Sequence, residues 1–258
     1  MTDPADTFSS RAAPGLRNRV ALLTGASGGI GTAIARRLAE DGVDLCLAYG
    51  THGEDAEAVG ADARERGRRV TVTSADLSDP EAPAALVAHA ERELGPVDLL
   101  IANAGIADVR GWQKIDLASW NATLAVNLTA PFLLCQQVLP GMVERGFGRI
   151  LFVSSVAAFT GGVVGAHYAA SKAGLHGLMH HLAPRVAADG VTVNCLAPAL
   201  VGGTKMFPAD PETGTPPVPI PVGRIGMPDE MADMAVTMLR TGYLTNKVIT
   251  VDGGLIPR

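Results

Sequence analysis

Near its N-terminus the chain reads Val20-Ala21-Leu22-Leu23-Thr24-Gly25-Ala26-Ser27-Gly28-Gly29-Ile30-Gly31. The first four residues form an apolar run typical of a buried strand, and helical periodicity begins at Gly29. The glycines between them allow a sharp turn and let a ligand approach the backbone. Because N–H groups at a helix start attract phosphate, this stretch predicts a strand, a phosphate-binding turn and a helix.

The same alternation continues along the rest of the chain. Further apolar runs lie at residues 45–48, 70–72, 97–102, 150–153, 191–196 and 248–251. Stretches with helical periodicity lie at residues 29–41, 55–66, 81–94, 120–144, 167–188 and 229–239. We therefore expect an α/β protein with one doubly wound Rossmann domain, about seven parallel strands and helices on both faces.

Two segments depart from this alternation. Residues 1–17 are rich in Asp, Ser, Pro and Ala and have no apolar signal segment, so we expect a flexible tail before a catalytic domain at 18–258. Residues 199–224 are rich in proline and glycine and follow the sixth strand at its carboxyl end. Open α/β sheets bind ligands at that edge, so a substrate lid is expected there, with a plain linker as the alternative.

Composition narrows the class of protein. Hydrophobic residues make up 47% and charged residues 18% of the 258-residue chain, as in a folded globular protein. A net charge of -5 argues against a nucleic-acid partner. Cys46, Cys135 and Cys195 have no metal-binding spacing, so we expect no metal site and a reducing, cytoplasmic location. We expect no membrane span, because we find no unbroken apolar window of sufficient length.

One pair of residues carries candidate chemistry. Tyr168 and Lys172 are four residues apart in a helical stretch, so their side chains lie on one face. A neighbouring ammonium favours the phenolate and lowers the pKa of tyrosine toward the range useful for proton transfer. Ser155 ends the preceding strand and is expected to flank the same cleft. Such a pair taken alone is more often an ordinary surface contact.

Several motifs taken together resemble the short-chain dehydrogenase/reductase family over residues 18–254. They are the GxxxGxG spacing of residues 25–31, Asn103-Ala104-Gly105, Asn127, Ser155, Tyr168 with Lys172, and Val251-Asp252-Gly253-Gly254. The resemblance implies that Tyr168 is the general acid or base and that Lys172 lowers its pKa and holds the nicotinamide ribose. It also implies that Ser155 polarises the substrate carbonyl and that Asn127 positions a water in the proton relay.

The resemblance also implies a set of cofactor-binding residues. Asp76 and Leu77 are expected near the adenine, although a cap of the following helix is the alternative for Asp76. Tyr49, Thr51 and His52 follow the second strand, where the adenosine ribose would lie. The remaining predicted contacts are Gly25, Ser27, Gly28, Gly29, Ile30, Gly31, Asn103, Ala104, Gly105, Tyr168, Lys172 and Pro198.

Cofactor choice depends on the end of the second strand. NAD enzymes usually carry Asp or Glu there, and this chain has Tyr49, so nothing repels a 2′-phosphate. The arginines that many NADP-using relatives carry are replaced by Gly28 and Gly50, and Thr51 and His52 offer hydrogen bonds instead. We expect NADP(H), with NAD(H) as the alternative.

The overall pattern resembles 3-oxoacyl-carrier-protein reductases, through residues 222–224 and Thr245-Asn246 among others. We expect a reductase of a ketone or a 3-oxoacyl thioester, with a substrate linked to acyl-carrier protein or CoA. A sugar or secondary-alcohol dehydrogenase and a non-catalytic nucleotide-binding regulator are the alternatives. Helices at 120–144 and 167–188 expose faces suited to a homodimer or homotetramer.

Overall fold

The computed structural model describes residues 15–211 and 214–257. Its centre is one parallel sheet in the order β3-β2-β1-β4-β5-β6-β7, which confirms the predicted seven-stranded Rossmann fold. The order reverses beside β1, and this is the place where open α/β sheets bind ligands. The strands are β1 Val20–Thr24, β2 Asp44–Tyr49, β3 Val70–Ser74, β4 Leu99–Ala102, β5 Gly148–Val153, β6 Val191–Pro198 and β7 Val248–Val251.

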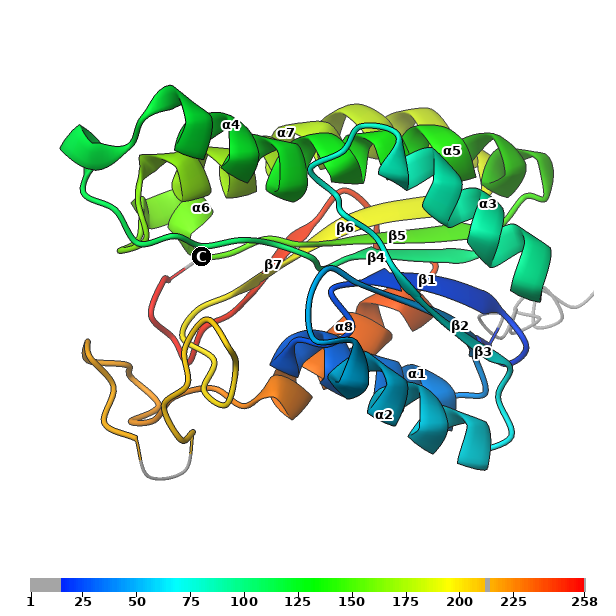
Figure 1. The fold of residues 1–258 in the computed structure, drawn as a ribbon, viewed down its shortest axis with the longest axis horizontal. Coiled ribbons are helices and arrows are strands. Elements are labelled where there is room, and N and C mark those ends of the chain that lie inside the picture. The colour runs from blue at the N-terminus through cyan, green and yellow to red at the C-terminus, as the bar shows by residue number, and fades with distance from the viewer. Residues whose placement is uncertain (1–14, 212–213, 258) are drawn as a thin grey trace, which may run out of the picture.

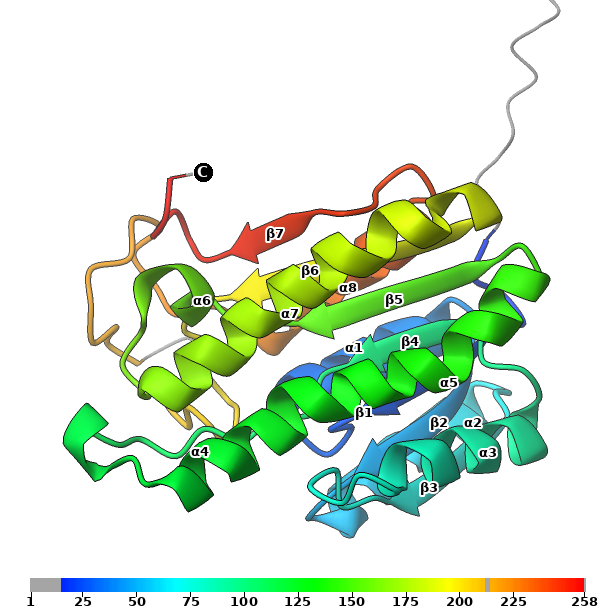
Figure 2. The ribbon, with the colours of Figure 1, turned by 90° about the horizontal axis from the view of Figure 1, so that it is seen from above.

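Helices cover both faces of the sheet (Figure 1). One layer contains α1 Gly29–Glu40, α2 Gly53–Glu65 and α8 Pro228–Arg240. The other contains α3 Ala82–Leu94, α4 Leu117–Leu124, α5 Ala130–Glu144 and α7 Ala166–Val186, and Figure 2 shows α4, α5 and α7 running across the sheet from above. The short helix α6 Ala157–Thr160 lies at the start of α7.

Two hydrophobic cores fill the space between the sheet and its helix layers. Successive strand residues point to opposite faces, so Leu22 belongs to the core under α5 and α7, and Leu23 to the core under α1 and α8. Both side chains are fully buried. Burial on both faces explains why these strands are apolar runs without alternation.

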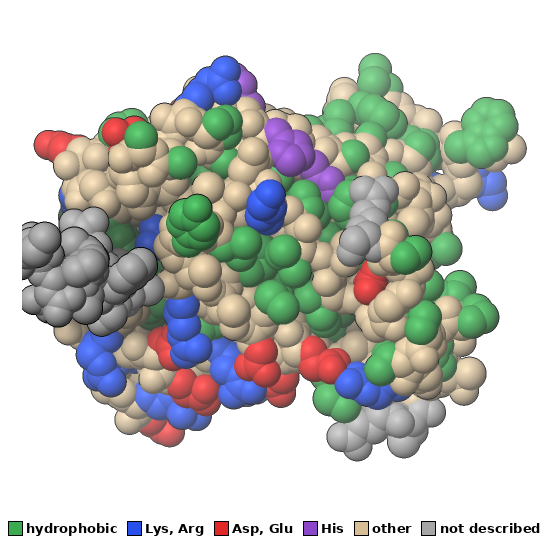
Figure 3. Space-filling model, turned by 180° about the vertical axis from the view of Figure 1, so that it is seen from behind, with side chains coloured by type: hydrophobic (Ala, Val, Ile, Leu, Met, Phe, Trp, Pro, Cys, Tyr) green, Lys and Arg blue, Asp and Glu red, His purple; other side chains and the backbone are tan. Residues whose placement is uncertain are grey.

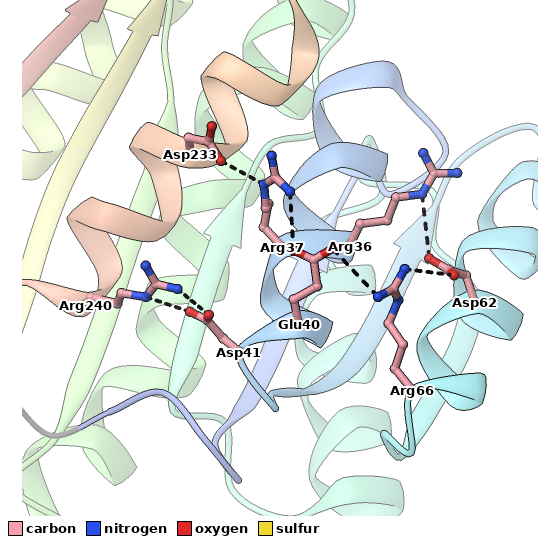
Figure 4. A network of polar contacts seen from close by, with 8 residues as sticks. All are labelled: Arg36, Arg37, Glu40, Asp41, Asp62, Arg66, Asp233 and Arg240. Atoms are coloured by element: carbon pink, nitrogen blue, oxygen red, sulfur yellow. Dashed lines mark hydrogen bonds and ion pairs between the residues drawn. The ribbon is translucent and has the colours of Figure 1, made fainter.

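On the face of the molecule that Figure 3 shows, most of the charged side chains lie over the layer of α1, α2 and α8. Its ion pairs form a network between the three helices (Figure 4). Arg37 pairs with Asp233 across α1 and α8 at 2.7 Å, and Arg36 with Asp62 across α1 and α2 at 3.7 Å. Arg240 also pairs with Asp41. These contacts lie at the surface, above the apolar packing of the same helices.

The structure corrects several sequence expectations. The predicted tail mostly lies outside the described residues, but its residue Leu16 is 3% exposed and belongs to the core, so the ordered domain includes it. The helix predicted at 120–144 begins at Leu117 and is interrupted by a π-turn, Ala125–Thr129. One stretch, Leu117–Glu144, is also long and apolar enough to cross a membrane by length and composition. It packs on α3, α7 and the sheet.

Candidate active site

The glycine turn joins β1 to α1 at the ligand-binding edge of the sheet. Gly25 has φ of +68°, and a Cβ there would lie 2.9 Å from the Ala104 backbone. A Cβ on Gly31 would lie 2.2 Å from the Gly25 carbonyl oxygen. The Asn103 side chain donates to the carbonyls of Thr24 and Gly25, both at 3.0 Å, and holds the turn against β4. Gly25 and Gly31 are therefore required by the packing of the turn itself.

Gly28 and the helix start have the character of an anion site. A Cβ on Gly28 would meet one neighbour, the Gly25 carbonyl oxygen at 3.4 Å, which is an ordinary contact. Packing therefore does not demand glycine at this position. Gly28 is the N-cap of α1 and has no side chain that could bond the N–H groups of the first turn. These features fit a pyrophosphate held by Ser27, Gly29, Ile30 and backbone N–H groups at the helix start.

The loop after β2 approaches the same turn. Ser27 Oγ donates to the Thr51 carbonyl at 2.9 Å, which connects the glycine turn to the loop. His52 is in the left-handed region, with φ of 61°, and precedes α2. Its Nδ1 lies 2.8 Å from Thr51 Oγ1. The structure thus brings together three of the predicted cofactor-binding residues, Ser27, Thr51 and His52, and Tyr49 ends β2.

Asp76 makes local contacts. Its carboxylate accepts from the Ser78 hydroxyl at 2.7 Å and the Ser78 N–H at 3.0 Å, and these bonds lower its pKa. These contacts lie within a local turn, and the N-cap of α3 is Glu81, so Asp76 does not cap that helix. Leu77 is buried beside it, in the core under α3 and α5. A contact between Asp76 and adenine stays a prediction.

Gly105 marks the point where the catalytic candidates converge. Asn103 and Ala104 donate their N–H groups to Thr24 Oγ1, both at 3.1 Å, and so bring the end of β4 against β1. A Cβ on Gly105 would lie 3.3 Å from both Asn127 Oδ1 and Lys172 Nζ. Lys172 is 67 positions after Gly105 in the chain (172 minus 105). It nevertheless lies against this glycine, as Asn127 does. A side chain there would press on both polar groups.

Asn127 lies in the π-turn and is fully buried. Its Oδ1 accepts from the Ile106 N–H at 2.9 Å, and its Nδ2 donates to the Ile106 carbonyl at 3.0 Å and to Ser171 Oγ at 3.1 Å. Ser171 Oγ in turn donates to the Tyr168 carbonyl at 2.7 Å. Both amide hydrogens are engaged, so the side chain fastens the β4 loop to α7. The predicted positioning of a water stays a prediction.

Tyr168 and Lys172 lie on one face of α7, as the spacing predicts, and burial has the largest effect on the pKa of each. Lys172 Nζ is 5.7 Å from the centre of the Tyr168 ring and donates to the Val153 carbonyl at 2.8 Å. Burial raises the pKa of Tyr168, and a hydrogen bond with Ser155 opposes the shift. Burial lowers the pKa of Lys172 to about 8, and Cys195 acts in the opposite direction. Burial thus dominates the pKa of Tyr168, and a lowering of that pKa by Lys172 stays a prediction.

Ser155 and Pro198 complete the cleft from two neighbouring strand ends. Ser155 follows β5, is half-buried, and accepts from the Ala157 N–H at 3.1 Å while it bonds to Tyr168. Pro198 ends β6, and its carbonyl accepts from the Val156 N–H at 2.9 Å. This bond joins the β6 end to the segment that carries Ser155. Both residues occupy the edge where the sequence places them.

The segment after β6 reaches the site, and sequence reasoning missed two of its contacts. Met206 Sδ lies 3.9 Å from the Tyr168 hydroxyl, and Lys205 Nζ lies 2.8 Å from Asp55 Oδ2 on α2. Nothing local in the sequence marks either residue, because both contacts join segments far apart in the chain. Ser171, inside the Tyr168–Lys172 stretch, was missed for the same reason. In the described part of the chain, no cluster of three or more His, Cys, Asp or Glu side chains could hold a metal.

Comparisons with known proteins agree with this geometry. Residues 19–213 match the sequence model of the family described as short chain dehydrogenase. The chain is 40% identical to nodulation protein G of Azospirillum brasilense, over 93% of this chain and 99% of that protein. It is 37% identical to acetoacetyl-CoA reductase of Allochromatium vinosum, over 92% and 98%. A blue fluorescent protein from a metagenomic library, solved in complex with NADPH, superposes with a TM-score of 0.87, at 35% identity and over 94% and 100%.

Proposed function

Because the chain belongs to the short-chain dehydrogenase family, we propose that it is an NADP(H)-dependent reductase of 3-oxoacyl thioesters. One observation carries the proposal. Tyr168 and Lys172 on α7, Ser155 after β5 and Asn127 in the π-turn come from three separate segments and meet at the carboxyl edge of the sheet, next to the glycine turn. The similarity to acetoacetyl-CoA reductase, whose name contains a 3-oxoacyl thioester, supports this substrate class.

The proposed roles follow from where each group lies. The nicotinamide, when bound, supplies the hydride for reduction or accepts it in the reverse direction. Tyr168 donates its phenolic proton to the carbonyl oxygen of the substrate, and Ser155 donates a hydrogen bond to the same oxygen. Burial raises the pKa of Tyr168, so its hydroxyl stays protonated at neutral pH and can act as the acid. Oxidation of the alcohol needs the phenolate and is therefore expected to speed up as pH rises.

Lys172 and Asn127 are proposed to act beside this proton donor. Lys172 holds the nicotinamide ribose, and its ammonium is already positioned by the Val153 carbonyl. Asn127 connects the β4 loop to α7 and so keeps Gly105 against the ammonium. The backbone around Gly25–Gly31 and Asn103–Gly105 would hold the cofactor phosphates and the nearer ribose. The NADPH-bound structure to which this chain is similar supports the choice of NADP(H) over NAD(H).

A single substitution tests the chemistry. In Tyr168→Phe the proton donor is lost while the ring remains, so we expect acetoacetyl-CoA reduction to fall by about 10²- to 10⁴-fold. NADPH binding, followed by fluorescence titration, should change little. If the variant still reduced acetoacetyl-CoA near the wild-type rate, the proposed mechanism would be wrong.

A substrate panel tests the substrate class. Acetoacetyl-CoA, a 3-oxoacyl thioester on acyl-carrier protein, simple ketones, sugars and secondary alcohols would each be assayed with both cofactors. A clear preference for one of the thioesters supports the proposal. Turnover of sugars or simple alcohols alone identifies the alternative dehydrogenase, and no turnover with intact cofactor binding identifies the regulator.

We further propose a cytoplasmic homodimer or homotetramer. The stretch from Leu117 to Val143 carries no charged residue. Only 39% of an apolar 18-residue segment within Leu117–Glu144 is buried inside one chain. Phe132 and Leu117 on it are 40% and 73% exposed. A second copy would cover such a surface. The three cysteines are free and buried, which supports a reducing compartment.

A further inference from the structure

A short segment after β6, residues 203–207, crosses the cofactor side of the molecule, and we call it the strap. Thr204 and Phe207 close its tip through N–H to carbonyl bonds of 3.3 and 3.1 Å. Its backbone lies against the start of α1, since a Cβ on Gly29 would be 2.9 Å from the Gly203 carbonyl oxygen. The strap therefore covers the turn expected to hold the pyrophosphate.

The two residues at the tip of the strap contact two different elements. Met206 reaches the Tyr168 hydroxyl on α7, at 3.9 Å. Lys205 reaches the first turn of α2, where its Nζ donates to Asp55 Oδ2 at 2.8 Å. Two adjacent residues of the strap thus contact the proton donor on α7 and the first turn of α2. The Lys205–Asp55 pair is half-exposed, with side-chain exposures of 46% and 55%, so it is free to exchange partners.

Lys205 lies beside the loop that follows β2. Asp55 is three residues after His52, and the pKa of Asp55 is lowered mainly by its hydrogen bond with Lys205 and also by the charge of His52. His52 in turn contacts Thr51, and Ser27 bonds to the Thr51 carbonyl. Asp55 thus connects Lys205 to a cluster of His52, Thr51 and Ser27 at the end of β2.

The loops of this cluster provide no Lys or Arg of their own. None occurs in residues 24–31 or 49–53. Gly28 and Gly50 stand where side chains would fit, because a Cβ on Gly50 would meet one atom, the Ala75 carbonyl oxygen at 3.9 Å. The ammonium that the fold brings to this cluster comes from the strap. A dianionic phosphate monoester attracts an ammonium more strongly than a single exposed carboxylate does.

We propose that Lys205 selects NADP(H): its ammonium leaves Asp55 and binds the 2′-phosphate, which draws the strap over the cofactor that carries this group. Asp55 holds Lys205 in place beforehand and competes with the phosphate for it. NAD(H) has no 2′-phosphate, so Lys205 stays on Asp55 when it binds. This inference rests on the proposed use of NADP(H) and assigns the residue that distinguishes the two cofactors.

Fluorescence titration of the full chain with NADPH and with NADH provides the test. Lys205→Met is expected to weaken NADPH binding about tenfold, the loss typical of one charge-assisted contact, and to change NADH binding less than twofold. Asp55→Asn removes the competitor and should strengthen NADPH binding alone. Lys247→Met is the matched control, because Lys247 is exposed and precedes β7 at the opposite edge of the sheet, and neither affinity should change.

A rescue variant and the salt dependence sharpen the result. Adding Gly50→Arg to Lys205→Met places a guanidinium on the same loop and should restore NADPH binding. The slope of log affinity against log salt concentration should be smaller in Lys205→Met than in the wild type, for NADPH only. Circular dichroism checks that each variant is folded.

The outcomes separate this inference from the proposed function. A wild-type preference for NADPH that survives Lys205→Met overturns the role of Lys205 and leaves the proposed function standing. An equal loss of affinity for NADPH and NADH also overturns it, because the strap would then bind both cofactors without recognising the 2′-phosphate. A wild-type preference for NADH removes the proposed cofactor choice and this inference with it, while the Tyr168→Phe test of the chemistry is unaffected.

Discussion

Lys172 is an ammonium inside the protein, with 4% of its surface exposed. Burial lowers its pKa from 10.5 to about 8, and its Nζ has the Val153 carbonyl as acceptor. A buried charge that a single carbonyl compensates destabilises the fold. Tyr168, one turn earlier on α7, is equally buried, and its pKa moves upward. The site is thus costly in folding free energy, as expected where polar groups are kept for chemistry.

We predict that Lys172→Met stabilises the protein at neutral pH while it impairs catalysis. A pKa drop from 10.5 to about 8 corresponds to roughly 3 kcal/mol, and the loss of a donor for Val153 offsets part of it, so a net gain of about 1–2 kcal/mol is expected at pH 7. Between pH 8 and 10.5 the unfolded wild-type chain binds a proton that the folded chain does not. Wild-type stability should therefore rise with pH in this window relative to the variant.

Urea unfolding from pH 7 to 10.5 measures both effects, with Lys247→Met as the exposed control. A variant that is less stable than the wild type at pH 7, or a stability difference that does not change with pH, would contradict the assigned burial penalty. The sign follows from the linkage relation, because stability rises with pH where the unfolded state holds more protons.

At the scale of elements, α1 and α8 illustrate which interactions hold a layer together. They pack through small and apolar residues, including Leu38 on α1 and Ala235 on α8, both fully buried in one core. Above this contact Arg37 pairs with Asp233 at the surface. Exposed ion pairs contribute little because water screens them and ordering the side chains costs entropy. The apolar contact should therefore carry most of the stability.

A matched pair of substitutions tests this ranking. Leu38→Ala removes fully buried carbon atoms and leaves a cavity, so a loss of about 3 kcal/mol in the free energy of unfolding is expected. Asp233→Asn breaks the ion pair at the same helix contact and should unfold at nearly the wild-type urea concentration. A loss after Asp233→Asn as large as that after Leu38→Ala would show that the surface network holds the layer.

At the scale of the whole molecule, the two helix layers differ in what they show to solvent. The α1, α2 and α8 layer is densely charged, whereas the stretch through α4 and α5 carries no charge from Leu117 to Val143. Large apolar side chains such as Phe132 are exposed on it. A surface of this kind is unfavourable in water and is typical of a subunit interface.

We predict that Phe132→Asp shifts the assembly toward monomers, because an unpaired charge would be buried at the proposed interface. Analytical ultracentrifugation at micromolar concentration should show dimers or tetramers for the wild type and at least a tenfold weaker association for the variant. Val109→Asp, on an exposed side chain outside α4 and α5, is the control and should assemble normally. A monomeric wild type would refute the proposed assembly.

Much of the fold could be predicted because it depends on local patterns. The apolar strands and amphipathic helices have a period that the sequence displays directly, and the seven-stranded parallel sheet and the family are confirmed. The interruption of the helix at Ala125–Thr129 could not be predicted, since the π-turn is stabilised by Asn127 bonding to Ile106 and Ser171 far along the chain. The helix-capping alternative for Asp76 is wrong, because Glu81 is the N-cap of α3 and Asp76 bonds Ser78 in its own turn.

By itself the sequence determined the strand–helix alternation, the glycine turn and the placing of Tyr168 and Lys172 on one helix face, because each depends on residues close together in the chain. Only the tertiary structure decided which groups Lys172 and Tyr168 meet, how burial moves their pKa values, and that Lys205 of the strap reaches Asp55 on α2. The physical reason is that solvation and charge contacts are set by whichever segments fold against a group. A local pattern places a side chain on a face, and its neighbours come from the rest of the fold.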